Sequence, residues 1–594
     1  GSSAVADGQY GSIRLQTGNR QHGAGGMLTM QRGKFSFSLN ANGGYMLQNG
    51  QEYESTITGT GFNSRTTSAM DMKAPMFMGD ASLSYEIDSL NLISATAGGM
   101  FFGMDQKGTG AAWTLLPGEK DYTRLYQGTL GMKQPFNNFH VDVDWQHNFA
   151  SYPGRMLTLS YRLNGSPATV SSYNTYDPAD AMPSRKMDGR TNSSDHTFQG
   201  DLTFPISEKA GTLSTGVKFI YRNNISSQDV SLMTYPSTEY QYDLGASTNY
   251  KYTNSIGAAY AEYSGTFGKW GIKAGGRYEH TWQDIYYNYS KGTDPDVSIN
   301  YGSFVPSASL QYTIGATQNI GMSYNMRISR PGITYLNPYV EQSDPNHWNL
   351  GNPDLDVEKT HNFSLVYNLY SQKFMLNATL FHNRNGNGIA QYNYTENDVL
   401  KTTYRNILQS QNTGLNLFFN VNIGKKARLY SNAEIQYTDM RNDQLGLKNY
   451  GWHGEIFAGS QQTIWWDLQL SEGIFSHTRD YELQGWNSGF TGCFAAITKS
   501  FLDDRLSLSL QGFTHLMGGK KVKFEMYSAD ADFETRTIIR VPVNQINLSL
   551  SWTFGKAGVS VKKTTRTITN DDVIEHSSGT SSASGMGSGS GMGM

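Results

Sequence analysis

Residues 34–45 read KFSFSLNANGGY, and this stretch decides the fold. Its apolar and small side chains fall on one parity, at Phe35, Phe37, Leu39, Ala41 and Tyr45. The intervening positions are polar, at Lys34, Ser36, Ser38, Asn40 and Asn42. Successive side chains of a β-strand point to opposite faces of its sheet. The stretch therefore predicts a strand with one apolar face and one polar face.

The same alternation recurs along nearly the whole chain, in about twenty-two segments of about ten residues each. In 139–149 the apolar positions are Phe139, Val141, Val143, Trp145 and Phe149, and in 541–554 they are Ile546, Leu548, Leu550, Trp552 and Phe554. Such strands are typical of a closed barrel with lipid outside and water inside. Propellers and β-helices are the soluble alternative, but the chain lacks their sequence repeat. We therefore predict an all-β transmembrane antiparallel barrel of about 22 strands.

Short and long connections alternate between these segments. Short links are expected at 32–33, 88–89, 268–269, 315–318, 371–373 and 424–426. Long links are expected at 47–76, 104–138, 164–195, 223–254, 286–302, 329–358 and 515–540. Short periplasmic turns and long extracellular loops are the asymmetry of bacterial outer-membrane barrels. We therefore expect the cell outer membrane of a Gram-negative bacterium, with both chain ends on the periplasmic side.

Composition excludes several other classes of protein. The 594 residues include no run of eighteen apolar residues, and the mean hydropathy is −0.51, so helical membrane spans are excluded. The net charge of −3 argues against nucleic acid as a partner. Cys493 is the single cysteine, which leaves neither a disulfide framework nor a thiolate metal cluster.

The sequence contains no catalytic motif of the common hydrolase, metalloprotease or nucleotide-binding types. We therefore expect no enzyme activity, no catalytic residue, no metal site and no cofactor. His140, Asp142 and Asp144 share one strand face and could bind a cation, but polar lining of a lumen is the favoured interpretation.

Three segments are expected. Residues 1–9 precede the first strand, residues 10–556 form the barrel, and residues 557–594 form a flexible Gly/Ser/Met-rich C-terminal tail in the periplasm. The tail could dock a partner or have no role, and its sequence leaves both possibilities open.

Two stretches go beyond a generic barrel pattern. They are WGIKAGGRYEHTW over 270–282 and SYNMRISRPGITYLNPYVEQSDPNHWNLGNPDLDVEKT over 323–360. They resemble the TonB-dependent receptors, in particular the outer membrane protein β-barrel family common in Bacteroidota. The specific matches are Arg330-Pro331, Leu336-Asn337-Pro338 and 351–355, which reads GNPDL, followed by Glu358. The resemblance covers roughly residues 10–570 and implies a barrel of about 22 strands.

The resemblance also implies a plug domain inside the barrel and a preceding motif that recruits TonB. Residues 11–18, GSIRLQTG, already read as the first barrel strand. We expect the plug to precede this strand in the native gene product, so that residues 1–9 are a residual segment between the plug and the barrel.

The resemblance implies a TonB-dependent transporter for a scarce ligand, which is a metal chelate, a peptide or a glycan. Its partners would be outer-membrane lipid and, through the plug, TonB. The alternative is a structural subunit of a complex for outer-membrane protein assembly, secretion or lipoprotein export, with a surface lipoprotein or other barrels as partners. An open diffusion pore is a third and weaker possibility.

Two sets of residues are candidates for function. The lumen-lining set is His140, Asp142, Asp144, Arg162, Lys273, Arg277, Glu279 and Arg327. The ligand-binding set lies in the predicted extracellular loops, at Tyr335, Tyr339, His347, Trp348, Tyr240 and Tyr242. Tyr and Trp offer contact area with a polar group, as peptide, glycan or protein ligands require. Packing of the loops against each other is the favoured alternative, because Asn337, Pro338, Asn352 and Pro353 read as structural turn residues.

Overall fold

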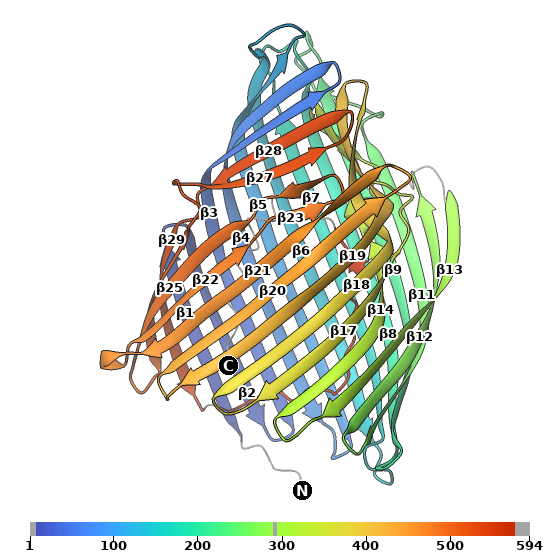
Figure 1. The fold of residues 1–594 in the computed structure, drawn as a ribbon, viewed down its shortest axis with the longest axis vertical. Helices are drawn as coiled ribbons and strands as arrows, with labels where there is room; N and C mark the ends of the chain where they lie inside the picture. The colour runs from blue at the N-terminus through green and yellow to red at the C-terminus, as the bar shows by residue number, and fades with distance from the viewer. Residues whose placement is uncertain (1–6, 289–293, 557, 576–594) are drawn as a thin grey trace.

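The computed structural model describes residues 7–288, 294–556 and 558–575. It is a ring of tilted strands in which the first strands lie beside the last strands (Figure 1). Regular helix in the described residues is confined to α1 (Ile333–Leu336) and a 3₁₀ turn at Trp465–Asp467. None of the helical segments in this described part is long and apolar enough to cross a membrane.

Twenty-two strands of the described chain form the barrel wall, as predicted. In chain order they are β1 (Gly8–Gly18), β2 (Gln21–Arg32), β3 (Phe35–Gly59), β4 (Phe62–Glu86), β5 (Asn91–Leu115), β6 (Thr123–Asn148), β7 (Met156–Asn174), β8 (Ser184–Ser207), β9 (Gly211–Met233), β11 (Thr248–Phe267), β12 (Trp270–Tyr286), β13 (Val297–Thr313), β14 (Gln318–Pro331), β17 (Glu358–Tyr370), β18 (Phe374–Glu396), β19 (Val399–Ile423), β20 (Ala427–Asn442), β21 (Leu447–Thr463), β22 (Gln469–His477), β25 (Phe490–Phe501), β26 (Leu506–His515) and β29 (Gln545–Gly555). Antiparallel pairing of β1 with β29 closes the ring, with Leu15 opposite Leu550. The closed antiparallel barrel predicted from the alternation is therefore confirmed.

The two faces of the wall differ as the alternation predicts. In β9, Val217 is 62% exposed and Phe219 is 44% exposed, whereas the intervening Lys218 is 7% exposed. In β29, Ile546, Leu548, Leu550 and Trp552 are all exposed. An exposed apolar band of this kind fits contact with lipid, and the polar face turns to the lumen.

Several strands are far longer than a bilayer requires. β3, β4 and β5 each have 25 residues and β6 has 26, whereas about 9–11 residues cross a bilayer. The sequence predicted a loop over 47–76, but the structure continues both strands to a tight turn between Gly59 and Phe62. Gly61 has φ +88° in this turn, a conformation that favours glycine. The prediction of a loop was wrong because polar residues predominate on both faces of this ribbon, and the few apolar residues of one face, such as Tyr53 and Ile57, give only a weak alternation.

The long-loop rim also carries two hairpins outside the ring of wall strands. They are β23 (Asp480–Glu482) with β24 (Gly485–Asn487), and β27 (Val522–Ala529) with β28 (Phe533–Val541). β24 pairs with β27, and β28 pairs with β3. The hairpins therefore continue the sheet beyond the closure of β1 with β29.

The facing assignment can be tested at Leu550 in β29. Leu550→Arg places a charge against lipid and should lower the free energy of unfolding by about 2–4 kcal/mol near the bilayer midplane. Chemical unfolding in lipid vesicles, followed by tryptophan fluorescence, measures this difference. The matched control is Gln511→Arg on the inner face of β26, which should change stability by less than about 0.5 kcal/mol. Equal effects of the two substitutions would contradict the assignment.

Candidate functional site: the barrel lumen

The structure places the predicted lumen residues on the face opposite the exposed apolar side chains. In β6 the exposed Phe139, Val141 and Val143 alternate with His140, Asp142 and Asp144. Arg162 approaches Asp142 at 3.4 Å.

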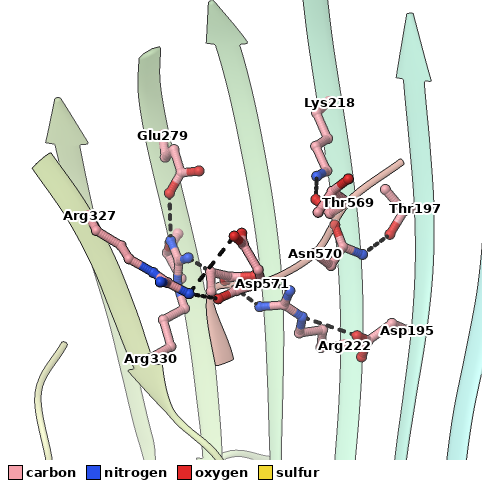
Figure 2. Close-up of polar contacts among 12 residues, drawn as sticks. Asp195, Thr197, Lys218, Arg222, Glu279, Arg327, Arg330, Thr569, Asn570 and Asp571 are labelled. Carbon is pink, nitrogen blue, oxygen red and sulfur yellow. Dashed lines mark hydrogen bonds and ion pairs between the residues drawn. The ribbon is translucent and has the colours of Figure 1, made fainter. Parts of the chain in front are cut away.

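A second group of the predicted residues lies on β12 and β14. Arg277 Nε donates to Glu279 at 2.6 Å, and Lys273 lies 3.4 Å from Glu262 on β11. Arg327 points from β14 toward the interior, where it contacts Asp571 (Figure 2). The predicted set thus forms two paired groups on the wall, and in the described residues no His, Cys, Asp or Glu cluster fits a metal ion.

Four of the six predicted ligand-binding residues belong to one segment that folds into the barrel. This segment, called the inward loop, is residues 332–357 between β14 and β17, and it contains α1, β15 (Val340–Asp344) and β16 (His347–Leu350). Its side chains contact the inner wall. Asn337 Nδ2 donates to Ser226 of β9 at 2.9 Å, and the Tyr339 hydroxyl bonds to Arg185 of β8.

The inward loop then crosses the lumen. The Tyr176 hydroxyl, after β7, donates to the Ser343 carbonyl at 3.1 Å, and Asp344 hydrogen-bonds Thr66 of β4. Directly after Asp344 the chain reaches β19, where β16 pairs in parallel with β19 and His347 Nε2 lies 2.6 Å from Thr402 Oγ1. β4 and β19 are far apart in the strand order, but the ends of β3 and β19 meet at this rim, where Leu400 packs with Ile57 of β3 and Phe533 of β28. The inward loop therefore runs from the β8–β9 side of the lumen to the place where these strand ends converge.

The predicted ligand-binding residues lie in two separate places, the inward loop and the loop between β9 and β11. Tyr335 packs edge-on against Tyr404 at 4.8 Å, and Trp348 lies under Lys401, so these aromatics contact the protein itself. In the other predicted loop, Tyr240 contacts Lys186 and Tyr242 is 57% exposed. The structure therefore brings Tyr335, Tyr339, His347 and Trp348 into one internal segment and leaves Tyr240 and Tyr242 apart from it.

Two titratable groups of the inward loop, Asp344 and His347, are buried at the turn between β15 and β16. Burial raises the pKa of Asp344 to about 6, although hydrogen bonds from the Asn346 amide, Thr66 and the His347 amide act in the opposite direction. Burial lowers the pKa of His347 to about 4. Both shifts favour the neutral form of the group in the closed loop.

The second element inside the barrel is residues 558–575, called the C-terminal segment. It leaves β29 at the rim of short turns and climbs the inner wall from β4 to β14. Lys562 pairs with Glu86 of β4, the Thr565 amide donates to Gln146 of β6 at 2.8 Å, and Arg162 of β7 donates to the Ile568 carbonyl at 3.4 Å.

This segment is the first part of the predicted periplasmic tail, and the structure places it against the lumen wall. Its polar groups are matched by the polar lumen wall, which the tail composition alone did not reveal. Residue 557 and residues 576–594 lie outside the described residues, as do residues 1–6 of the predicted N-terminal segment.

Asp572 is the centre of the contact between the C-terminal segment and the wall. Its carboxylate accepts two hydrogen bonds from Arg222 of β9, at 2.6 and 2.7 Å, and one from Arg330 of β14 at 2.5 Å. Both guanidinium groups are almost fully buried. They are held in turn by wall carboxylates, Arg222 by Asp195 at 3.3 Å and Arg330 by Glu279 at 2.9 Å (Figure 2). Bidentate arginine–carboxylate bonds fix orientation as well as adding energy.

The C-terminal segment ends at the base of the inward loop. β30 (Val573–Ile574) pairs in parallel with Arg330 and Pro331 of β14, and the Gly332 amide donates to the Ile574 carbonyl at 2.7 Å. The Glu575 carboxylate accepts hydrogen bonds from the amide and the hydroxyl of Thr334. The two internal elements are therefore joined where β14 leaves the wall.

Sequence reasoning identified Arg330 as part of a family pattern, but it missed the partner that Arg330 shares with Arg222. The only signal was the short acidic run 570–572, which reads NDD and precedes the Gly/Ser/Met tract. Nothing local indicates that a carboxylate distant in sequence returns to these arginines.

The sequence matches the model of the "Outer membrane protein beta-barrel family" over residues 147–552. This chain belongs to that family. A search of curated proteins gave no significant match.

Solved structures with a similar fold include several outer-membrane receptors and transporters. The ferric enterobactin receptor PfeA of Pseudomonas aeruginosa is 12% identical with a TM-score of 0.58, and the match covers 93% of this chain and 81% of that chain. The copper transporter OprC is 11% identical with a TM-score of 0.64, and the coverage is again 93% and 81%. The ferric citrate transporter FecA is 12% identical with a TM-score of 0.55, covering 92% and 78%. At these identities the likeness shows a shared fold, that of TonB-dependent receptor barrels.

The paired shifts of Asp344 and His347 predict how opening of the inward loop depends on pH. The raised pKa of Asp344 stabilises the closed loop as pH falls toward 4, because the closed form binds a proton that the open form releases. The lowered pKa of His347 acts oppositely, because the open form binds the proton below about pH 6.5. The two effects largely offset each other between pH 4 and 6.

Asp344→Asn should remove the stabilisation of the closed loop at low pH and leave the opposite effect of His347. The variant's loop should open roughly twentyfold more often at pH 5 than at pH 7, whereas the native loop should change only about twofold. Hydrogen exchange of the amides of β15 and β16, corrected for the intrinsic pH dependence of exchange, measures the opening. Adding His347→Gln to the variant should abolish the dependence. An equal pH response of native protein and Asp344→Asn would disprove the assignment.

Proposed function

We propose that this protein is a TonB-dependent outer-membrane transporter that binds a scarce ligand at its long-loop rim and passes it through the lumen. The observation that carries the proposal is the inward loop, which runs from β14 across the lumen of a family barrel to β4 and β19. A loop across the lumen suits a receptor that holds its ligand before passage. It argues against a simple diffusion pore, whose lumen would have to remain open.

Ligand contact is proposed for the loop between β9 and β11. Tyr235 is 63% exposed, Tyr242 is 57% exposed and Leu244 is 69% exposed there. Lys186 lies 4.3 Å from the Tyr240 ring centroid, which adds a positive charge beside the aromatic surface. Aromatic and cationic groups together suit an anionic ligand with flat apolar parts. We therefore propose a metal chelate as the first class to test, consistent with the iron and copper compounds in the names of the solved structures.

Transport without chemistry on the ligand is part of the same proposal. By family resemblance, a plug domain encoded before residue 10 would close the lumen and contact TonB. The long-loop rim would then face the cell exterior and the short-turn rim the periplasm.

A role as a subunit of a larger envelope complex is the second hypothesis. It relied on a tail available to partners in the periplasm. Residues 558–575, the first part of that tail, are instead bound to the lumen wall, which weakens that support. The transporter is therefore the favoured function.

Uptake assays test the proposal with the full reading frame expressed in a Gram-negative host that lacks its own ferric siderophore receptors. Iron-labelled ferric enterobactin and ferric citrate are the probes. We expect uptake of at least one probe, and its loss when the proton gradient is collapsed. Tyr242→Ala should raise the KM of uptake by about fivefold, the size expected for loss of one interfacial aromatic contact worth about 1 kcal/mol.

The matched control is Tyr152→Ala, because Tyr152 is equally exposed but lies on the opposite rim, between β6 and β7. It should leave the KM unchanged. Uptake that continues without a proton gradient would refute the TonB-dependent mechanism, and uptake of neither probe would refute the proposed ligand class.

A further inference from the structure

The inner wall under the C-terminal segment has the features of a peptide-binding site. We propose that this track, which runs over β6, β7, β8, β9 and β14, binds an extended peptide bearing a carboxylate, and that residues 565–575 are its resident occupant. The inference does not depend on whether the barrel transports a ligand.

The segment is bound with the two-residue period of an extended peptide. Thr564 and Ile568 are buried against the wall, and Asn570 and Asp572 continue the same parity as half-buried side chains. The intervening residues from Thr565 to Glu575 are exposed toward the lumen. Alternate side chains therefore enter the wall, which is how proteins read peptides bound in β-conformation.

Wall side chains also bind the main chain of the segment. Lys218 Nζ donates to the Thr569 carbonyl at 2.7 Å, and Arg327 donates to the Asp571 carbonyl at 3.1 Å (Figure 2). Gln146 accepts from the Thr565 amide. Contacts of this kind do not depend on side-chain identity, so the track can accept any extended chain that fits it.

Specificity comes from the side chains that enter the wall. Asn570 Nδ2 donates to Thr197 Oγ1 at 2.9 Å, and Asp572 binds both buried arginines. The wall cluster around Asp572 comprises four cations and two carboxylates: Lys218, Arg222, Arg277, Arg330, Asp195 and Glu279. The wall thus has two positive charges in excess before the occupant is counted. Each buried guanidinium group has one wall carboxylate, and its further N–H groups bind Asp572. Buried donors left without acceptors are costly, so the track favours a ligand with a carboxylate at this position.

Main-chain pairing completes the site at its upper end. Arg330 and Pro331 pair with Val573 and Ile574 as a short parallel ladder. Pairing of an added strand with a sheet provides affinity, and the carboxylate fixes the register along the track. The site therefore favours a carboxylate directly before the paired residues.

The experiment cuts the occupant from its barrel after folding. A recognition sequence for a site-specific protease is inserted after Lys556 in the full chain, and the purified barrel in detergent is then cleaved. We expect the cut segment to co-elute with the barrel in gel filtration. An excess of a synthetic peptide of residues 565–575 should displace it, as measured by mass spectrometry of the barrel fraction.

Two altered peptides decide the specificity. The Asp572→Asn peptide should need roughly 30-fold more material for the same displacement, because it loses a buried charge pair. The matched control is the Asp571→Asn peptide, since the Asp571 side chain is 76% exposed and 3.8 Å from Arg327. It should act within about twofold of the native peptide.

Three outcomes overturn the proposal. The first is release of the cut segment before any competitor is added. The second is a segment that no peptide displaces, which would show a fixed part of the fold rather than an exchangeable site. The third is equal potency of the two altered peptides.

Discussion

The rest of the structure depends on the pairing of β1 with β29. A sheet edge in contact with lipid would leave its amide and carbonyl groups without partners, so a membrane-spanning sheet must close on itself. Closure fixes an inside and an outside for every strand, and the alternating sequence then assigns each side chain to lipid or to water. Leu15 opposite Leu550 and Ile13 opposite Trp552 show the apolar face continuing across the closure without a break.

Closure also creates a polar interior, and the chain places two of its own segments there. The inward loop crosses near the long-loop rim, and the C-terminal segment climbs from the short-turn rim. Both segments are bound by polar groups of the inner wall, including arginines, asparagines and hydroxyls. In a barrel without internal segments these groups would face water. The paired charges of the lumen, such as Arg277 with Glu279, are therefore part of a binding surface and more than solvated lining.

The sequence predicted the barrel well because its main signal is local. Phe139, Val141 and Val143 alternate with His140 and Asp142 whatever lies elsewhere in the chain. The extensions beyond the bilayer were missed because polar residues predominate in a ribbon such as 47–59, where Tyr53 and Ile57 leave only a weak alternation to detect. The internal segments were missed for a different reason. The bonds of Asp572 to Arg222 and Arg330 join residues separated by 350 and 242 positions, and no local pattern records such a pairing.

The candidate site was predictable to the same extent. Tyr335, Tyr339, His347 and Trp348 were singled out because aromatic and polar residues gather in one long connection, and their role in ligand binding stays a prediction. Sequence could not distinguish an exposed binding loop from one folded inward, since both use the same residue types. Only the contacts with Ser226, Arg185 and Thr402 reveal which arrangement is present.

Glu575 and Thr334 join the end of one internal segment to the start of the other. Such a joint makes the two binding equilibria thermodynamically linked. Suppose that a molecule binds the inward loop more tightly when the C-terminal segment is attached to it. Such a molecule must, by reciprocity, raise the affinity of the wall for the C-terminal segment by the same factor. A ligand bound to the inward loop would then change how tightly the C-terminal segment is held, through the hydrogen bonds of Thr334 with Glu575 and of Gly332 with Ile574.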